Sequence, residues 1–517
     1  MNLKSREKDK LPNLNSEKAV INWFKKHITD DGSPYLLDKD QAKIVLDQHK
    51  NTLVTARAGS GKTRTIVAKI VFLLTYYKIK PESIIVFAFN RKAKTEINER
   101  LTKIAYQDKP LFKTTPRIAT TFHAFAYLTL GGKKELRKKL LTEEKEAEFT
   151  SDLNPETKQF IARAEQQYPG QLNKLRSKIK SEKDLNIKNA LLKKYQELEL
   201  YHQKLKSKGL INFNQLMDLS KTALTKKKTK LKYIFVDEYQ DFSLLFLEQI
   251  KALRTTCPAA HLLAVGDDWQ AINRFAGSDI KYFTNFEKYF TENTKKLFIP
   301  TNYRSNKKIV KNANYFMSKA LHDYQGCKSG NKKLKGKIYL KDINSPKANL
   351  DINQSTKIPL LLKRYLNYVV KIIINNPEKS VKILHRNNYL SFKDWSLEKF
   401  MSEISNILKN NYRYTDKDLE LISYSTIHRS KGLEADIVIL LEIDAEEFPG
   451  KDKTSGLFQI FGDDAKTIFE DEARLFYVAL TRPKEKLYII TKTPKITKEN
   501  RKLNFISYLN DEWINFI

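Results

Sequence analysis

Cysteine is nearly absent from this sequence, with only Cys257 and Cys327 among 517 residues. Two cysteines are too few for a disulfide framework, an iron–sulfur cluster or a four-cysteine zinc site. Long apolar runs are also lacking: the longest, such as Ile84–Phe89 and Ile437–Leu441, have the length of a strand and cannot cross a bilayer. The first residues, MNLKSREKDKLPN, are polar and do not resemble a signal peptide. We therefore expect a soluble, cytoplasmic protein.

Acidic residues are scarce relative to basic ones. The 94 Lys and Arg residues face 60 Asp and Glu residues, which gives a formal net charge of +34. Such a balance favours a polyanionic partner, nucleic acid first and an anionic membrane surface second. Lysine placed on every solvated face would give the same composition, so the net charge alone does not identify a nucleic-acid-binding protein. Internal repeats and long disordered linkers are absent, and the apolar content of 41% is typical of a globular protein.

Short apolar runs recur along the chain and predict buried parallel strands. Most are followed by a polar or glycine-bearing turn and then a helical pattern, which indicates an α/β fold with ligands at the carboxyl ends of the strands. The runs are Thr52–Thr55, Ser83–Phe89, Tyr233–Val236, His261–Val265, Val381–Leu384, Ile437–Leu441 and Leu487–Ile490. The stretch from about Gly131 to Lys208 is rich in Lys, Glu, Leu and Gln and predicts a helical insertion.

A glycine-rich turn, ARAGSGKT, connects the first of these strands to a helical pattern. A strand, a glycine-rich turn, Lys-Thr and a helix in this order are typical of a phosphate-binding loop. Gly59 and Gly61 allow backbone N–H groups to surround phosphate oxygens, Lys62 reaches the β- and γ-phosphates, and Thr63 is placed for Mg²⁺. The first position is alanine where the strict pattern has glycine. The residues expected to bind the nucleotide are Ala56, Arg57, Ala58, Gly59, Ser60, Gly61, Lys62 and Thr63.

A second motif, YIFVDEYQD at 233–241, is an apolar strand that ends in paired acids. Asp237 at the tip of the strand can hold Mg²⁺ through water, and Glu238 is placed to polarise the attacking water. An acidic pair after a strand is common by itself. In a chain that already has a phosphate-binding loop, it predicts a Mg²⁺-dependent nucleoside triphosphatase.

These two motifs together resemble those of superfamily 1A helicases of the UvrD/Rep type. The segment VGDDWQAINRFAG at 265–277 is more similar still to the DNA helicase IV branch, with Trp269 where the wider family usually has aspartate. Further runs between about residues 37 and 490 resemble other motifs of the family and occur in the family's order. They are AFNRKA at 88–93, TFHA at 121–124, INFNQL at 211–216, NYRS at 302–305, TIHRSKG at 426–432 and LFYVALTR at 475–482.

The resemblance implies an α/β fold of two RecA-like P-loop NTPase lobes with parallel sheets. It also implies a helical insertion in the first lobe. The stretch between Arg304 and Thr426 is far shorter than in UvrD or Rep, so we expect a reduced or absent insertion in the second lobe. The expected divisions are an N-terminal extension at 1–30, the first lobe at 31–130 and 211–290, the helical insertion at 131–210, and the second lobe at 291–517.

The resemblance also assigns roles around ATP. Gln41 would read the adenine edge, because its amide carries both a donor and an acceptor. Arg64 and Tyr303 would sandwich the adenine ring between a guanidinium and a phenol. Arg304 and Arg482 would contact the γ-phosphate from the second lobe, where planar guanidinium donors stabilise the charge of phosphoryl transfer. Two further residues complete the set: Gln270, which reports the γ-phosphate to the DNA-facing motif, and Glu434, which lies near the ribose.

For the DNA groove, the family uses aromatic stacking and small polar contacts. Phe89 and Phe275 match the stacking positions, where a base on an aromatic face contributes about 1–3 kcal/mol without sequence preference. Thr121, His123 and His428 match positions that contact the DNA. Phenylalanine is more often a core residue, and the two histidines could instead be buried couplers between the nucleotide and DNA sites.

The function that the sequence predicts is an ATP-dependent 3′→5′ DNA helicase or translocase, with ATP and Mg²⁺, in DNA repair or recombination. The main alternative is a UvrD-like translocase subunit with weak unwinding of its own, which works with a nuclease partner, for example in phage defence. A nucleotide-dependent module acting on RNA or protein is a different class. A basic membrane-surface protein is the weakest alternative, because no basic amphipathic helix with a clear apolar stripe is present.

Overall fold

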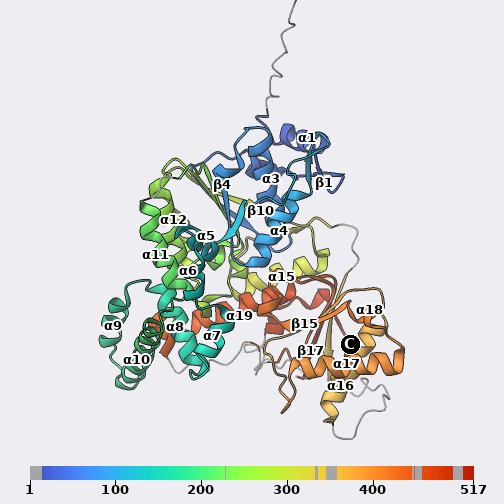
Figure 1. Cartoon of the computed structure of the whole chain (residues 1–517). Helices are drawn as coiled ribbons and strands as arrows, with labels where there is room; N and C mark the ends of the chain where they lie inside the picture. Colours follow the sequence, from blue (N-terminus) through green and yellow to red (C-terminus); the bar gives the residue numbers. More distant parts are fainter. Residues whose placement is uncertain are drawn as a thin grey trace, which may run out of the picture.

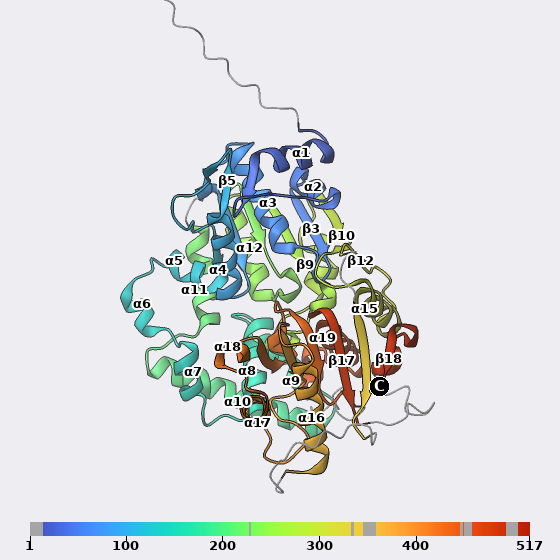
Figure 2. The ribbon, with the colours of Figure 1, turned by 90° about the vertical axis from the view of Figure 1, so that its right-hand side faces the viewer.

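The computed structural model describes residues 14–226, 229–331, 336–344, 358–444, 448, 457–492 and 505–517. Two lobes, each built on a parallel sheet, lie one above the other in Figure 1, and a group of helices lies beside the second lobe. The side view in Figure 2 shows the same stacking of the lobes. The α/β fold class predicted from the sequence is confirmed.

The first lobe contains a six-stranded sheet in the order β10-β3-β9-β8-β4-β7, and every neighbouring pair is parallel. All five residues of β4 are buried, as expected for a strand with helices on both faces. The strands are β3 (Asn51–Ala56), β4 (Ile84–Ala88), β7 (Ala119–Thr121), β8 (Tyr233–Val236), β9 (His261–Gly266) and β10 (Thr294–Ile299). The helices are α2 (Lys39–Leu46), α3 (Lys62–Thr75), α4 (Arg91–Thr102), α5 (Phe122–Thr129), α11 (Phe213–Thr225), α12 (Leu244–Thr256), α13 (Lys281–Thr284) and α14 (Phe286–Tyr289).

The chain before the phosphate-binding loop packs onto this lobe. Helix α1 (Glu17–His27) buries Trp23 and Phe24, whose rings lie 5.7 and 6.2 Å from the ring of Phe72 on α3. A small antiparallel sheet in the order β2-β1-β5-β6 adjoins it. Its strands are β1 (Ile28–Asp30), β2 (Ser33–Pro34), β5 (Ile104–Tyr106) and β6 (Lys109–Pro110).

The predicted helical insertion is confirmed. Five helices lie between α5 and α11, in the teal and green part at the lower left of Figure 1. Leu175, Leu191 and Leu198 belong to an apolar core that these helices share with Leu457–Phe461 of the second lobe. The helices are α6 (Lys134–Lys139), α7 (Glu143–Phe149), α8 (Pro155–Gln167), α9 (Leu172–Lys180) and α10 (Leu185–Ser207).

The second lobe has its own six-stranded parallel sheet, in the order β15-β14-β16-β17-β13-β18. The strands are β13 (Lys337–Asp342), β14 (Val381–His385), β15 (Ile422–Thr426), β16 (Ala435–Leu440), β17 (Pro483–Thr491) and β18 (Ile514–Phe516), with the pair β11 (Thr301–Asn302) and β12 (Lys328–Ser329) beside them. The helices are α15 (Lys307–Ala320), α16 (Leu360–Ile374), α17 (Leu397–Tyr412), α18 (Asp416–Leu419) and α19 (Ala465–Leu480). Only α17 and α18 lie between β14 and β15, so the second-lobe insertion is reduced, as predicted.

All seven strands predicted from the sequence are present, whereas several others were not predicted. Strands β7, β10, β15 and β18 lie at sheet edges, and β13 lies next to an edge. An edge strand is partly solvated, so its sequence lacks the continuous apolar run by which the central strands were recognised. Strand β10, TKKLFI, shows this with two exposed lysines. Within the described part of the chain, no helix is long and apolar enough to span a membrane.

Candidate nucleotide and DNA site

The glycine-rich turn lies at the carboxyl edge of the first sheet, between the end of β3 and the start of α3. Gly59 and Gly61 have φ angles of +70° and +80°, which L side chains rarely adopt. A Cβ at Gly59 would lie 2.7 Å from Cβ of Arg304 in the second lobe. Asn302 donates from Nδ2 to the Ala58 carbonyl at 2.7 Å, and the Tyr303 N–H donates to the Gly59 carbonyl at 2.8 Å. The second lobe therefore contacts the loop directly.

The paired acids lie beside this turn. Asp237 follows the end of β8 and is 4% exposed, and Lys62 Nζ is 3.6 Å from a carboxylate oxygen of Glu238. Glu238 has a φ of +53°, a conformation that costs a non-glycine residue about 1–3 kcal/mol and is concentrated at functional sites. Burial and the charge of Glu238 raise the pKa of Asp237. Burial also opposes ionisation of Glu238, but Lys62 and Lys431 outweigh it and lower the pKa of Glu238.

The two predicted arginines belong to the second lobe and lie at its junction with the first lobe beside the phosphate-binding loop; this junction is called the cleft below. Arg482 is 1% exposed and donates from Nη2 to Oε1 of Gln270 at 3.2 Å. Burial, reinforced by the charge of Arg304, lowers the pKa of Arg482 to about 9. Arg304 donates from Nε to Glu434 at 2.7 Å and from Nη1 to the Thr481 carbonyl at 3.3 Å. The structure thus brings both arginines, Gln270 and Glu434 together around the loop.

The residues predicted to hold adenine make other contacts in this structure. Gln41 accepts from the Asp38 N–H at 3.2 Å and donates to the Ser60 carbonyl at 3.3 Å, so it bridges α2 and the loop. The guanidinium of Arg64 lies 4.1 Å from the centre of the Tyr35 ring. Tyr303, which is 45% exposed, donates its hydroxyl to Asp38. Adenine contact by Gln41, Arg64 and Tyr303 remains a prediction.

The predicted stacking residues are outside the apolar cores. Phe275 is 47% exposed and Phe89 is 37% exposed. The Phe275 ring, from the first lobe, lies 5.4 Å from the ring of His428 in the second lobe, edge to face. The Thr121 hydroxyl caps α5 by accepting from the Ala124 N–H at 3.2 Å.

The two histidines of this region are neutral at pH 7. The imidazole of His123 lies 5.0 Å from the ring of Phe213. Burial lowers the pKa of His123 to about 4. Burial, together with the charge of Arg386, also lowers the pKa of His428 to about 4. Neither side chain therefore offers a positive charge to a phosphate.

Several buried polar residues of the cleft were not predicted from the sequence. Gln240 donates to Glu238 and accepts from the Asp267 N–H at 2.9 Å, so it joins the ends of β8 and β9. Lys431, from the second lobe, pairs with Asp241 and donates to the Gln270 carbonyl at 2.9 Å. These residues lie inside recognised motifs, but their partners come from other motifs, so linear spacing could not reveal the contacts.

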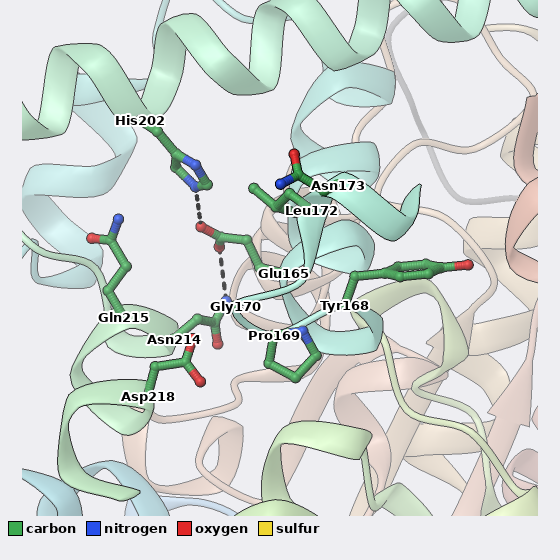
Figure 3. Close-up of a pocket in the computed structure, with 10 residues that line it drawn as sticks. All are labelled: Glu165, Tyr168, Pro169, Gly170, Leu172, Asn173, His202, Asn214, Gln215 and Asp218. Atoms are coloured by element: carbon green, nitrogen blue, oxygen red, sulfur yellow. Dashed lines mark hydrogen bonds and ion pairs between the residues drawn. The ribbon is translucent and has the colours of Figure 1, made fainter. Parts of the chain in front are cut away.

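A separate pocket of about 320 Å³ lies between the helical insertion and α11. Figure 3 shows Glu165 at its centre, with His202 and Asn214 pointing toward the carboxylate. Glu165 accepts from Asn212 at 2.6 Å and from Asn214 at 2.8 Å, and lies 2.8 Å from Nε2 of His202. These partners satisfy the carboxylate and connect the insertion to the first lobe, which indicates a structural role.

Comparison with known proteins identifies the family. Residues 37–291 match the UvrD/REP helicase N-terminal domain, and residues 390–493 match the UvrD-like helicase C-terminal domain. This chain belongs to the UvrD/Rep helicase family. The two matched ranges include the phosphate-binding loop, the paired acids, Gln270, Glu434 and Arg482.

Three relatives within the UvrD/Rep family illustrate the similarity. DNA helicase IV of Escherichia coli (strain K12) is 28% identical over 505 residues, which cover 88% of this chain and 68% of that protein. The ATP-dependent DNA helicase Rep of Buchnera aphidicola is 29% identical over 371 residues, 68% of this chain and 52% of that protein. The ATP-dependent DNA helicase PcrA of Staphylococcus aureus is 27% identical over 299 residues, 54% of this chain and 39% of that protein. This chain therefore spans between 39% and 68% of the length of these UvrD/Rep relatives.

The exposure of Phe275 in this UvrD/Rep chain leads to a direct prediction. Replacing Phe275 with alanine should weaken binding of single-stranded DNA by about 1–3 kcal/mol, because one base loses its aromatic partner. Fluorescence anisotropy of a labelled oligonucleotide measures the change. Phe516→Ala is the control, since Phe516 is also exposed but lies in β18 at the far edge of the second sheet. Equal affinity of Phe275→Ala and wild type would contradict the stacking role.

Proposed function

We propose that this chain is an ATP-dependent DNA translocase and helicase that moves 3′→5′ on single-stranded DNA. The observation that carries the proposal is the composition of the cleft. Lys62, Asp237 and Glu238 come from one lobe, Arg304 and Arg482 come from the other, and all five lie around one phosphate-binding loop. Phosphoryl transfer needs positioning and charge stabilisation from both sides of the phosphate, and this arrangement supplies both.

In this proposal Mg²⁺ is held by Thr63 and Asp237. Mg²⁺ keeps several waters and usually takes one or two protein ligands together with substrate phosphates. The cleft fits this chemistry, because Asp237 is buried next to Glu238 and its carboxylate lacks enough positive charge to keep its pKa low. Within the described residues, no group of three or more His, Cys, Asp or Glu side chains could hold a metal ion. Bound Mg²⁺ would supply charge neutralisation of the phosphates.

The proposed motion is opening and closing of the two lobes. Asn302 and Tyr303 contact the loop directly, so a change in what the loop holds would act on the second lobe. Phe275 and His428 lie on opposite lobes with their rings in contact, so a motion of one lobe against the other would displace them relative to each other. Closure that depends on ATP, followed by opening after hydrolysis, would advance a strand held between these residues and Phe89.

The DNA substrate and the cellular role are inferred from the family and not from the contacts in the cleft. The relatives named as DNA helicases support DNA as the substrate. We further propose a role in DNA repair or recombination in the cytoplasm. The predicted division at residues 31–130, 131–210, 211–290 and 291–517 is proposed with one correction: β10 (Thr294–Ile299) pairs with β3, so the first lobe extends past residue 291 to the end of that strand.

A translocase subunit that works with a nuclease partner is the second candidate. The observation that favours it is the reduced insertion of the second lobe, where only α17 and α18 lie between β14 and β15. A small insertion offers little surface for holding duplex DNA ahead of the motor.

Unwinding of matched duplexes with a 3′ or a 5′ single-stranded tail, in the presence of ATP and Mg²⁺, tests the proposal. We expect the purified chain to open the 3′-tailed duplex only. Opening of the 5′-tailed duplex alone would contradict the polarity. Opening of neither duplex, with DNA-stimulated hydrolysis intact, would favour the translocase subunit.

A further inference from the structure

Arg57, the second residue of the glycine-rich turn, lies in a buried polar cluster. Its side chain has no solvent exposure. Nη1 donates to Asp267 at 2.9 Å and to Asp268 at 2.5 Å, and Nε donates to the Gln325 carbonyl at 2.9 Å. Nη2 lies 3.7 Å from a carboxylate oxygen of Asp323. With these partners, the side chain binds the protein itself, so the predicted nucleotide contact of Arg57, which stays a prediction, would be made by its backbone.

Trp269 covers the guanidinium of Arg57, with the ring centre 3.8 Å from Cζ. Its indole N–H donates to Asp323 at 2.6 Å, and its ring lies 5.2 Å from the ring of Tyr477, edge to face. Asp323 follows α15 and Tyr477 lies in α19, so both belong to the second lobe. Trp269 and Ala58 are part of the apolar core that the second lobe builds. The cluster therefore joins the phosphate-binding loop to the second lobe.

The same cluster continues to the γ-phosphate arginine of the proposed mechanism. The carboxylate of Asp267 accepts from Arg57 through Oδ1 and from Gln270 through Oδ2, the latter at 2.5 Å. Gln270 in turn accepts from Nη2 of Arg482 at 3.2 Å. Arg57, Asp267, Gln270 and Arg482 thus form a continuous chain of hydrogen bonds, and each of them is at most 4% exposed.

The charge of Arg57 holds this series of hydrogen bonds together. Burial by itself lowers the pKa of Arg57, but Asp268 and Asp267 outweigh burial and raise it, so the guanidinium stays charged. A guanidinium has donors in a fixed planar fork and can hold Asp267, Asp268 and Gln325 at the same time. A lysine ammonium is a point charge and cannot reproduce that geometry.

We propose that Arg57 is a positioning residue that couples the phosphate-binding loop to Arg482 through Asp267 and Gln270. The stacked Trp269 extends the same coupling to the second lobe through Asp323. When the lobes close on ATP, the loop and the arginine that faces the γ-phosphate are aligned as one unit. This inference rests on the proposed ATPase function.

The test is the Arg57→Lys variant of the full chain, which keeps the positive charge and loses the fork. We expect kcat for DNA-stimulated ATP hydrolysis to fall by about tenfold or more, the effect of one lost charge-assisted hydrogen bond. The KM for ATP should stay within about twofold. Arg57 would act through the contact of Arg482 with the γ-phosphate, and the loss of a contact made only in the transition state lowers kcat without raising KM. A raised KM with unchanged kcat would overturn the inference.

Arg163→Lys is the matched control. Arg163 is another arginine with no side-chain exposure, paired with Asp463 and lying 4.9 Å from the Phe461 ring, but it joins the helical insertion to the second lobe. We expect Arg163→Lys to leave kcat near the wild-type value. An equal fall of kcat in both variants would show a general effect of altering a buried arginine and would overturn the positioning role.

A double-mutant cycle with Gln270→Ala separates the coupling from the proposed function. If Arg57 acts through Gln270, the effects of Arg57→Lys and Gln270→Ala on kcat should be far from additive, whereas independent sites add. The same cycle measured by thermal unfolding needs no hydrolysis. A wild-type chain without ATPase activity would refute the proposed function, and additive unfolding effects would refute the coupling.

Discussion

The Glu238→Gln variant should hydrolyse ATP roughly 10²- to 10⁴-fold more slowly than the wild type, the usual contribution of a general base. Glutamine has the same shape as glutamate, but its amide cannot accept the proton of the attacking water. ATP binding should persist, because Lys62 and the backbone of the loop are unchanged. A phosphate-release assay with saturating single-stranded DNA measures the rate, and binding of a fluorescent ATP analogue measures affinity.

Glu248→Gln is the control for this substitution. Glu248 is a partly buried carboxylate on α12 that pairs with Lys221 at 2.5 Å. It lies outside the cleft, so Glu248→Gln should retain wild-type hydrolysis. If Glu238→Gln hydrolysed ATP at the wild-type rate, Glu238 would not be the general base and the site assignment would be wrong.

The Arg482→Lys variant should lose about 10³-fold or more in kcat, as expected when an arginine that stabilises phosphoryl transfer is replaced. The guanidinium of Arg482 donates to the Val478 carbonyl at 2.8 Å, to the Leu433 carbonyl at 3.1 Å and to Gln270 at 3.2 Å. A lysine ammonium cannot reach all three acceptors and also face the γ-phosphate. The pre-steady-state rate of phosphate release reports the loss.

Arg254→Lys controls for the loss of a guanidinium. Arg254 donates to Asn51 at 2.6 Å, at the amino end of β3, on the edge of the sheet opposite the phosphate-binding loop. Its replacement should leave kcat unchanged. A retained kcat in Arg482→Lys would mean that Arg482 only stabilises the second lobe.

The central part of the fold was predictable because its strands are buried on both faces. Strands such as β4 and β16 consist almost entirely of apolar residues, so their sequences reveal them directly. The edge strands β10 and β15 are partly exposed, and their polar residues hide the strand pattern. The helical insertion was predictable for a different reason. A long stretch that is rich in Lys, Glu and Leu and has no strand-like apolar run favours helices over strands.

The candidate site likewise has a part that the sequence predicts and a part that it does not. The phosphate-binding loop and the paired acids are contiguous in sequence, so their chemistry could be recognised before the fold was known. The cluster around Arg57 could not be, because Asp267, Asp323 and Gln325 come from segments far apart in the chain and from both lobes. A buried ion cluster has no sequence period, and only the packing of the two lobes brings its members together.

The contacts of Arg64 show what a motif leaves open. The family resemblance predicts that Arg64 stacks on adenine, and this contact stays a prediction. The structure adds two neighbours that the motif does not specify: the guanidinium lies on Tyr35 and 3.5 Å from Asp30. A motif specifies which residue is present, but the neighbours of that residue come from the rest of the chain. Tyr35 lies outside the motif, and it gives Arg64 an aromatic partner of its own.

The central claim is that single-stranded DNA bound across the two lobes stimulates ATP hydrolysis in the cleft. The most direct measurement is the steady-state rate of ATP hydrolysis by the purified chain without nucleic acid, with single-stranded DNA, and with single-stranded RNA of the same sequence. We expect strong stimulation by DNA, and loss of that activity in Lys62→Ala. Stimulation by RNA but not by DNA, or full activity in Lys62→Ala, would contradict the account.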